Sequence, residues 1–154
     1  MLLDPKKITD SPDGSFDIID EAILYFRANV FFKNFAIEGD ADKVLVYLTV
    51  FIQKILERGN VPDEKKSREI IKGLVEKCEY VKKSENFFNL LVTDDHNASS
   101  MTNLQNYLRE LRAETVDRMI NILFDNPITK MDRKFWMQLG KKKFMNYDMP
   151  VASK

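Results

Sequence analysis

The chain has 154 residues, 44% hydrophobic and 31% charged, a composition that suits one compact domain with a substantial core. Its 24 basic and 24 acidic residues leave a formal net charge of zero, which argues against a nucleic-acid binder, because such proteins use excess cations to neutralise phosphates. The lone Cys78 excludes an internal disulfide, and the N-terminus lacks the basic, apolar and small-residue order of a signal peptide, so a cytoplasmic protein is expected.

The chain begins with residues 1–16, where prolines, a glycine and polar residues predict an irregular arm. A helix is expected to begin near Ser15 or Asp17, because Asp20 and Glu21 then lie at the positive end of its dipole. The apolar residues that follow recur at helical spacing and form two stripes, one with Ile19, Ala22, Ile23, Phe26 and Val30 and one with Ile18, Tyr25 and Phe32.

A cluster of aromatic residues marks the end of this first helix. Phe31, Phe32 and Phe35 stand around Lys33 and Asn34, and they offer more aromatic surface than one narrow core stripe requires. Two interpretations fit: core aromatics at a helix end, or anchors for a partner, since aromatics beside a cation suit interface hot spots.

The most hydrophobic stretch is VLVYLTVFI at residues 44–52. Because no face of a helix through it is polar, other elements must enclose it, and we predict a central buried helix over residues 40–58. A buried strand has the same composition, but Asp40 as N-cap and Gly59 as a left-handed C-terminal residue favour the helix. Charged residues bound the run well below the length of about 20 residues that a membrane span needs.

A third helix is predicted over residues 63–83, with an inner face of Ile71, Leu74, Val75 and Cys78. Cys78 lies on this apolar stripe and is interpreted as a small buried hydrophobe. Residues 84–99 form an irregular connection that contains His96, the single histidine, which is a poor metal-site candidate in a solvated loop.

A long helix is predicted over residues 100–124, ended by Asp125-Asn126-Pro127. Its inner stripe is expected to hold Leu104, Tyr107, Leu108, Leu111, Thr115, Met119, Ile122 and Leu123. On its surface, Glu114 and Arg118 are placed to form a pair one turn apart. Thr129 and Asp132 resemble a capping pair for a last helix that contains Phe135, Trp136 and Leu139.

After Gly140 comes a basic segment, Lys141, Lys142 and Lys143, followed by Phe144 and Met145. Three lysines beside an aromatic residue suit binding to phosphates or to an acidic protein surface. A solvated basic helix end is an equal alternative, because cations are favourable at a helix C-terminus. Residues 147–154 form a polar tail.

The sequence holds no catalytic constellation. Its glycines stand singly, so there is no phosphate-binding loop, and Gly140-Lys141 lacks the upstream glycine and the following Ser or Thr. One histidine and one cysteine on different elements do not suggest a nucleophilic pair. We therefore expect neither an enzyme nor a bound cofactor or metal.

Four long strings resemble one family, subunit 3 of the actin-related protein 2/3 complex. They are DIIDEAILYFRANVFFKNF (17–35), ADKVLVYLTVFI (41–52), YLRELRAET (107–115) and KFWMQLGKKKFMN (134–146). They are collinear with the family and, with the helices between them, span most of residues 17–146. The chain departs from the family's pattern in a shorter N-terminal segment and in lacking a Pro- and Gly-rich loop at 84–100.

The resemblance implies an all-α domain of five helices over residues 17–146, with one helix surrounded by the others. It also implies a non-catalytic subunit of the seven-protein assembly that nucleates branched actin filaments in the cytoplasm and cytoskeleton, packed against actin-related protein 3 and near the mother filament. On this hypothesis the candidate contacts are Phe31, Phe32, Lys33, Asn34, Phe35, Trp136, Lys141, Lys142, Lys143, Phe144 and Met145. The alternative is a free-standing helical adaptor that binds anionic surfaces through Lys141, Lys142 and Lys143.

Overall fold

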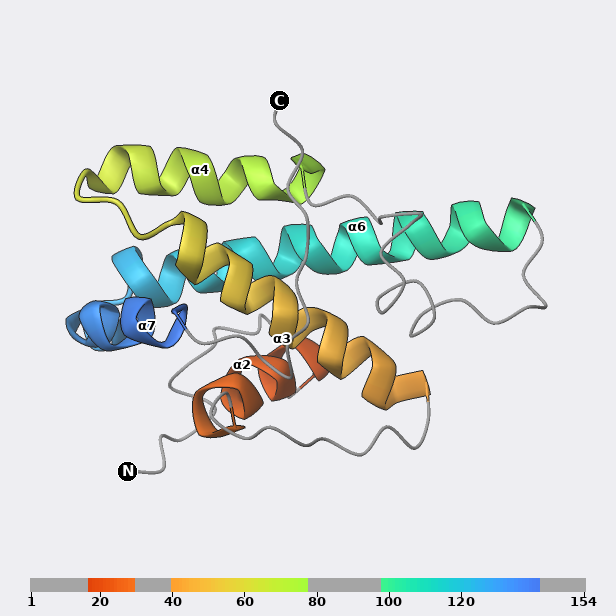
Figure 1. Ribbon diagram of the computed structural model, residues 1–154, viewed down its shortest axis with the longest axis horizontal. Helices are drawn as coiled ribbons and strands as arrows, with labels where there is room; N and C mark the ends of the chain where they lie inside the picture. Colours follow the sequence, from red (N-terminus) through yellow and green to blue (C-terminus); the bar gives the residue numbers. More distant parts are fainter. Residues whose placement is uncertain (1–16, 30–39, 78–97, 142–154) are drawn as a thin grey trace.

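The computed structural model describes residues 17–29, 40–77 and 98–141, and this part of the chain is built from helices (Figure 1). Its α-helices are α2 (Ile18–Asn29), α3 (Asp40–Arg58), α4 (Glu64–Lys77), α6 (Ala98–Ile120) and α7 (Arg133–Leu139). A π-helical turn, η1 (Asn121–Asp125), continues α6, and a 3-10 helix, η2 (Thr129–Asp132), leads into α7. The predicted all-α fold is confirmed.

Several predictions fall outside the described residues. They concern the arm at 1–16, the helix end at 30–35, the segment at 78–97 with Cys78 and His96, and the C-terminal residues 142–154. Among the described helices, none combines the length and the hydrophobicity that a membrane-spanning segment requires.

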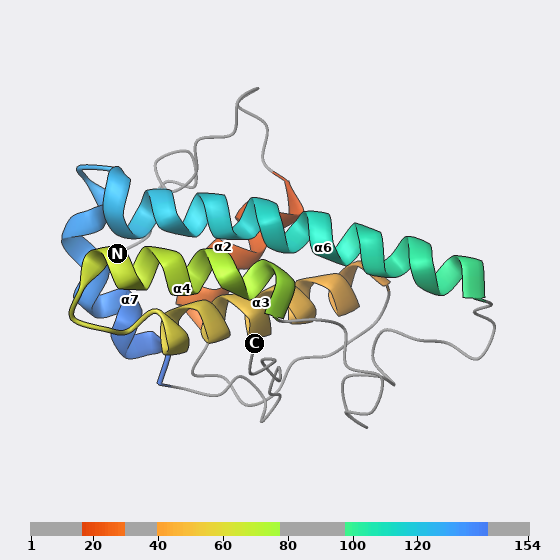
Figure 2. The ribbon, with the colours of Figure 1, turned by 90° about the horizontal axis from the view of Figure 1, so that it is seen from above.

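Helix α3 lies at the centre of the fold, as the sequence predicted. It packs against α2, α4, α6 and α7, and every residue from 45 to 56 is buried. Helices α4 and α6 lie side by side in both views, while α2 covers another side of α3 (Figures 1 and 2). Even the polar Gln53 and Lys54 are only 3% exposed, and Lys54 Nζ pairs with Glu57 Oε2 at 3.0 Å. The enclosure follows from the apolar run at residues 44–52, in which eight of nine residues are apolar and no face is suited to water.

The N-terminus of α2 is capped by Asp17 and tied to α6. Asp17 Oδ1 accepts hydrogen bonds from the backbone N–H groups of Ile19 and Asp20, at 3.1 and 3.0 Å, and Asp20 Oδ2 accepts one from Asp17 N at 3.2 Å. The guanidinium of Arg118 also binds both carboxylates, with Nη1 2.6 Å from Asp17 Oδ1 and 3.0 Å from Asp20 Oδ1. Asp17, one of the two residues near which the helix was expected to begin, therefore caps α2 and also joins it to α6.

A buried arginine, Arg112, fixes α6 against α3 and α4. Arg112 is 4% exposed, and its Nη1 donates a hydrogen bond to the hydroxyl of Tyr47 at 2.9 Å. Its Nε donates to the backbone carbonyl of Val75, also at 2.9 Å. Buried polar groups are stable when their hydrogen bonds are made, so this arginine links three helices from inside the core.

The long helix does not continue as a regular α-helix to residue 124. Its last turn, η1, is π-helical, and the N–H of Asn126 donates to the carbonyl of Asn121 at 2.7 Å. This wider turn buries three consecutive apolar residues, Ile122, Leu123 and Phe124. Among the residues of the predicted inner stripe whose burial is described, Tyr107 is on the outside, with 45% exposed.

The capping pair predicted at Thr129 and Asp132 is wrong. Thr129 Oγ1 donates to the carbonyl of Ile122 at 2.8 Å, and Asp132 makes no side-chain cap for α7. The turn is capped instead by Asn126, whose Oδ1 accepts from the N–H groups of Ile128 and Thr129 at 2.9 and 3.2 Å. Asn126 can cap this turn because its amide oxygen reaches the backbone N–H groups two and three residues ahead.

The left-handed conformation predicted for Gly59 is also wrong, since its φ lies outside the left-handed region. Glycine is needed for space instead: a Cβ there would lie 2.7 Å from the carbonyl oxygen of Ile55 and 2.8 Å from Ile71 Cδ1. Ser67 on α4 completes the junction by donating to the carbonyl of Gly59 at 2.5 Å. Glycine is therefore required here by the close approach of α3 and α4, and not by the backbone conformation of the turn.

Candidate functional site: subunit-contact surfaces

Trp136, predicted as a partner contact, is a core residue. It is 1% exposed, and its ring stacks on Phe26 of α2, with ring centroids 6.4 Å apart and an interplanar angle of 8°. The guanidinium of Arg27 covers the pair, 5.5 Å from the Trp136 ring. The ring is thus used to hold α7 against α2 and offers no surface to a partner in this structure.

The other predicted contact residues are only partly described. Lys141 follows α7 and is exposed. Phe31, Phe32, Lys33, Asn34 and Phe35 and the segment Lys142, Lys143, Phe144 and Met145 lie outside the described residues, so their role as contacts stays a prediction.

Three exposed apolar side chains that the sequence did not reveal lie immediately before η2, in η2 and in α7. Ile128 is 66% exposed, Met131 82% and Phe135 46%. We call these three residues the η2–α7 patch. Their spacing of three and four residues was a possible signal, because residues at this spacing lie on one face of a regular helix.

The backbone beneath the η2–α7 patch is held in place by several contacts. Asn126 caps the turn before it, and Thr129 bonds to η1. The guanidinium of Arg27 lies 5.1 Å from the centroid of the Phe135 ring and pairs with Asp132 at 3.7 Å. Cation–π contact and hydrogen bonding together hold this segment against α2 and η1.

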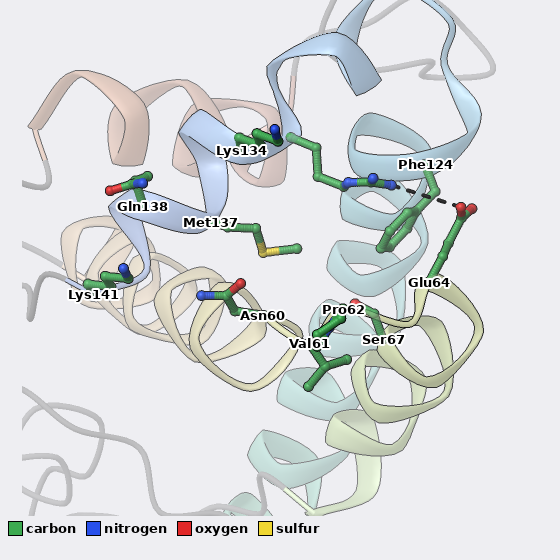
Figure 3. A pocket seen from close by; sticks show the side chains of 11 residues that line it. Asn60, Val61, Pro62, Glu64, Ser67, Phe124, Lys134, Met137, Gln138 and Lys141 are labelled. Carbon is green, nitrogen blue, oxygen red and sulfur yellow. Dashed lines mark ion pairs between the residues drawn. The ribbon is translucent and has the colours of Figure 1, made fainter.

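A pocket of about 340 Å³ lies on another side of α7, between it, the α3–α4 turn and η1 (Figure 3). Lys134 and Gln138 extend from α7 and Lys141 from the turn after it, and Glu64 and Ser67 come from α4 across from them. Val61, Pro62, Phe124 and Met137 provide its apolar lining. Three basic residues, Arg133, Lys134 and Lys141, against one acidic residue favour an anionic group over a cationic one.

Two arginines enclose the aromatic wall of this pocket. The guanidinium groups of Arg68 and Arg133 lie 5.0 and 5.3 Å from the centroid of the Phe124 ring. Glu64 pairs with both, at 2.9 Å to Arg68 Nη2 and 3.9 Å to Arg133 Nη1, and Asp125 Oδ1 lies 2.7 Å from Arg68 Nη2. The hydrogen bonds that Arg68 donates to Asp125, and then those to Glu64, raise the pKa of Arg68, so this cation stays charged at any ordinary pH.

Within the described ranges, no three His, Cys, Asp or Glu side chains are grouped so that they could hold a metal ion.

The family model and the similar proteins all indicate the same family. Residues 4–149 match the model of the P21-Arc family, described as the 21 kDa ARPC3 subunit of the ARP2/3 complex. The chain is similar to actin-related protein 2/3 complex subunit 3 of Arabidopsis thaliana, 36% identical over 138 residues that cover 88% of this chain and 78% of the relative. The Dictyostelium discoideum subunit 3 is 34% identical over 135 residues, covering 86% of this chain and 76% of the relative.

The relative from Saccharomyces cerevisiae carries the same name and is 32% identical over 147 residues, covering 87% of this chain and 78% of its own length. The family match spans nearly all of the chain, including the whole of the described helical domain. The chain therefore belongs to the P21-Arc family, the subunit 3 family of the actin-related protein 2/3 complex.

Proposed function

We propose that this chain is the subunit 3 component of an actin-related protein 2/3 complex and supports the nucleation of branched actin filaments. The observation that carries the proposal is the family match over residues 4–149. Relatives at 34% and 36% identity over most of the chain, both named as this subunit, support it.

The proposal gives the chain a structural, non-catalytic role. Its partners would be the other subunits of the complex, with actin-related protein 3 as the direct neighbour and the mother filament close by. The protein would then act in the cytoplasm, at the actin cytoskeleton. A rigid helical core with an exposed apolar patch suits a subunit whose surface is covered by neighbours.

Branch formation by a defined complex tests this role. The complex would be purified with this chain and, separately, after depletion of this chain, and branches on labelled actin filaments would be counted by fluorescence microscopy. Depletion is expected to lower the branching rate, and adding back the purified chain is expected to restore it. Full branching without the chain, unchanged by its addition, would contradict the proposal.

A further inference from the structure

We infer that the pocket between α7, the α3–α4 turn and η1 binds a phosphate monoester, a doubly charged anion, with Lys134 and Lys141 as its main contacts (Figure 3). This is a ligand-binding activity in addition to the structural role proposed above, and it does not depend on that role. It connects Lys141, which the sequence suggested as a phosphate contact, with residues that only the fold brings beside it.

Three polar side chains on α7 and the turn after it lie on one face of this segment. Lys134 and Gln138 are four residues apart and Lys141 follows three residues later, which is the spacing of neighbours on a helix surface. Helix α7 ends at Leu139, but Gly140 keeps helical dihedral angles, with φ −64° and ψ −15°, so Lys141 continues the same face. Figure 3 shows Gln138 between the two lysines. An anion that lies over Gln138 can therefore be reached by both flexible lysine side chains.

These side chains are available to a ligand. Lys134, Gln138 and Lys141 are exposed, and so is Asn60 on the α3–α4 turn. Within the described residues, the four side chains make no hydrogen bond and no ion pair. The two ammonium groups therefore lack a carboxylate partner there, and the two amide groups can donate hydrogen bonds to a bound anion.

The charge of the lining matches that of a phosphate monoester. Arg133, Lys134 and Lys141 carry three positive charges and Glu64 carries one negative charge, which leaves a balance of plus two. A phosphate monoester carries a charge of about −1.5 to −2 near neutral pH and has three acceptor oxygens, whereas a carboxylate carries a single charge. Glu64 repels the anion only weakly, because Arg68 Nη2 lies 2.9 Å from its carboxylate. The lining therefore favours a phosphate monoester over a carboxylate.

The apolar part of the pocket favours a phosphate attached to an uncharged organic group. The pocket volume of about 340 Å³ is at the lower end of the range of about 300 to 1,000 Å³ for small-molecule sites. Val61, Pro62 and Met137 provide contacts for the organic group. The Phe124 ring is already in contact with two guanidinium groups, so we do not expect an aromatic base to stack on it. The ligand class is thus an organic phosphate monoester, either free in solution or as a lipid headgroup.

The test titrates the purified, ¹⁵N-labelled full-length chain with cyclohexyl phosphate and follows the backbone amide signals by NMR. We expect saturable shifts around the pocket, and Lys134→Met/Lys141→Met is expected to weaken binding by about tenfold or more. The control Lys72→Met/Lys77→Met removes the same charge from the exposed side of α4 and is expected to bind like the wild type. The diester methyl cyclohexyl phosphate, which carries one charge, is expected to bind several-fold more weakly than the monoester.

Four results would overturn the inference. They are the absence of saturable binding, equal weakening by the two double variants, equal affinity for the monoester and the diester, and binding that appears only after residues 144–154 are removed. The last result would show that the C-terminal segment of this chain occupies the pocket. Thermal unfolding checks that each variant is folded, and if the double variant melts early, Lys141→Met alone decides, because this side chain follows the last helix and is exposed.

Flotation with lipid vesicles distinguishes the two sources of the phosphate. Vesicles that contain phosphatidylinositol 4-phosphate present a monoester, and vesicles that contain phosphatidylinositol present only a diester. Retention on the first kind alone, lost in Lys134→Met/Lys141→Met, would support the inference with a lipid headgroup as the ligand. Binding of cyclohexyl phosphate without retention on either kind would support it with a free organic phosphate. Equal retention on both kinds would contradict recognition of a monoester.

Discussion

Arg118 binds Asp17, a residue 101 positions earlier in the chain, through both of its terminal nitrogens. Nη1 lies 2.6 Å from Asp17 Oδ1, and Nη2 lies 2.7 Å from Asp17 Oδ2. The arginine side chain is 9% exposed, and Asp20, which it also contacts, is 1% exposed. This ion-pair cluster therefore joins α6 to the N-terminus of α2 at the edge of the core.

Replacing Arg118 by methionine is expected to lower the free energy of unfolding by about 2 to 4 kcal/mol, because the buried carboxylate of Asp20 loses a cationic partner. Urea denaturation measures the change. Arg109→Met is the matched control on the same helix, since its partner Glu76 and Arg109 itself are both largely exposed. If the two variants lost equal free energies of unfolding, burial of the Arg118 cluster would contribute nothing to stability.

The stability that Asp17 contributes is expected to disappear at acid pH. Hydrogen bonding from Arg118, more than the backbone bond from Asp20, holds the pKa of Asp17 below its ordinary value of 3.8, against the effect of partial burial. As the pH falls past 3.8, the unfolded chain takes up this proton before the folded chain does. The contribution is therefore complete above this pH and is lost as the pH falls through the folded pKa.

Urea denaturation of wild type and Asp17→Asn over a range of pH isolates this effect from the other carboxylates. The difference in the free energy of unfolding is expected to be constant above about pH 5 and to shrink below about pH 4. A difference that is the same at about pH 3 and about pH 6 would contradict the assignment.

Gly140→Ala is expected to destabilise the protein by about 1 to 3 kcal/mol through overpacking. A Cβ at this position would lie 2.5 Å from Leu56 Cβ and 2.9 Å from Glu57 N, both on α3, whose helical backbone cannot move aside. The carbonyl of Gly140 also accepts a bond from Gln53 Nε2 at 2.8 Å, which would be strained by any shift.

Gly73→Ala supplies the opposite control. The nearest atom to a Cβ there is Lys77 Cε at 3.9 Å, and alanine is a better helix former than glycine, so thermal unfolding should occur at the same or a higher temperature. If both alanine variants melted alike, the close contact between Gly140 and α3 would not be a feature of the protein in solution.

Trp136→Ala is expected to reduce the free energy of unfolding by about 3 to 5 kcal/mol, because it opens a cavity beside Phe26. Met131→Ala, on the outer side of the same segment, should change it by no more than about 0.5 kcal/mol. Chemical denaturation of the isolated chain distinguishes the two. A Trp136→Ala variant that keeps its stability but loses its partners would restore the original interpretation of this residue as a contact.

The sequence predicted α3 with its observed bounds because an all-round apolar run must be enclosed whichever way the helix is turned. Pairs of neighbouring residues on one helix could be predicted equally well. The predicted contact between Glu114 and Arg118, one turn apart, is present at 3.1 Å. The contacts of Arg118 with Asp17 and Asp20 could not be predicted in this way. Local spacing does not indicate which distant carboxylates the fold brings close to Arg118.

The candidate site was harder to predict from the sequence, for a geometric reason. Helical spacing gives the direction of each side chain only while the period stays constant, and here it changes from α to π in η1, to 3-10 in η2 and back to α in α7. The phase read from α6 was therefore lost before Trp136, which points inward, and before Met131 and Phe135, which point outward. Composition alone favoured the tryptophan as a contact, because aromatics are common in both cores and interfaces.

We claim that this chain is a subunit of an actin-related protein 2/3 complex, and capture of its partners from the native extract tests this most directly. The tagged full-length chain would be used as bait at moderate and high salt, and the captured proteins identified by mass spectrometry. We predict the recovery of two actin-related proteins together with the remaining subunits under both conditions. Recovery of this chain alone, from an extract in which the other subunits are detectable, would contradict the claim.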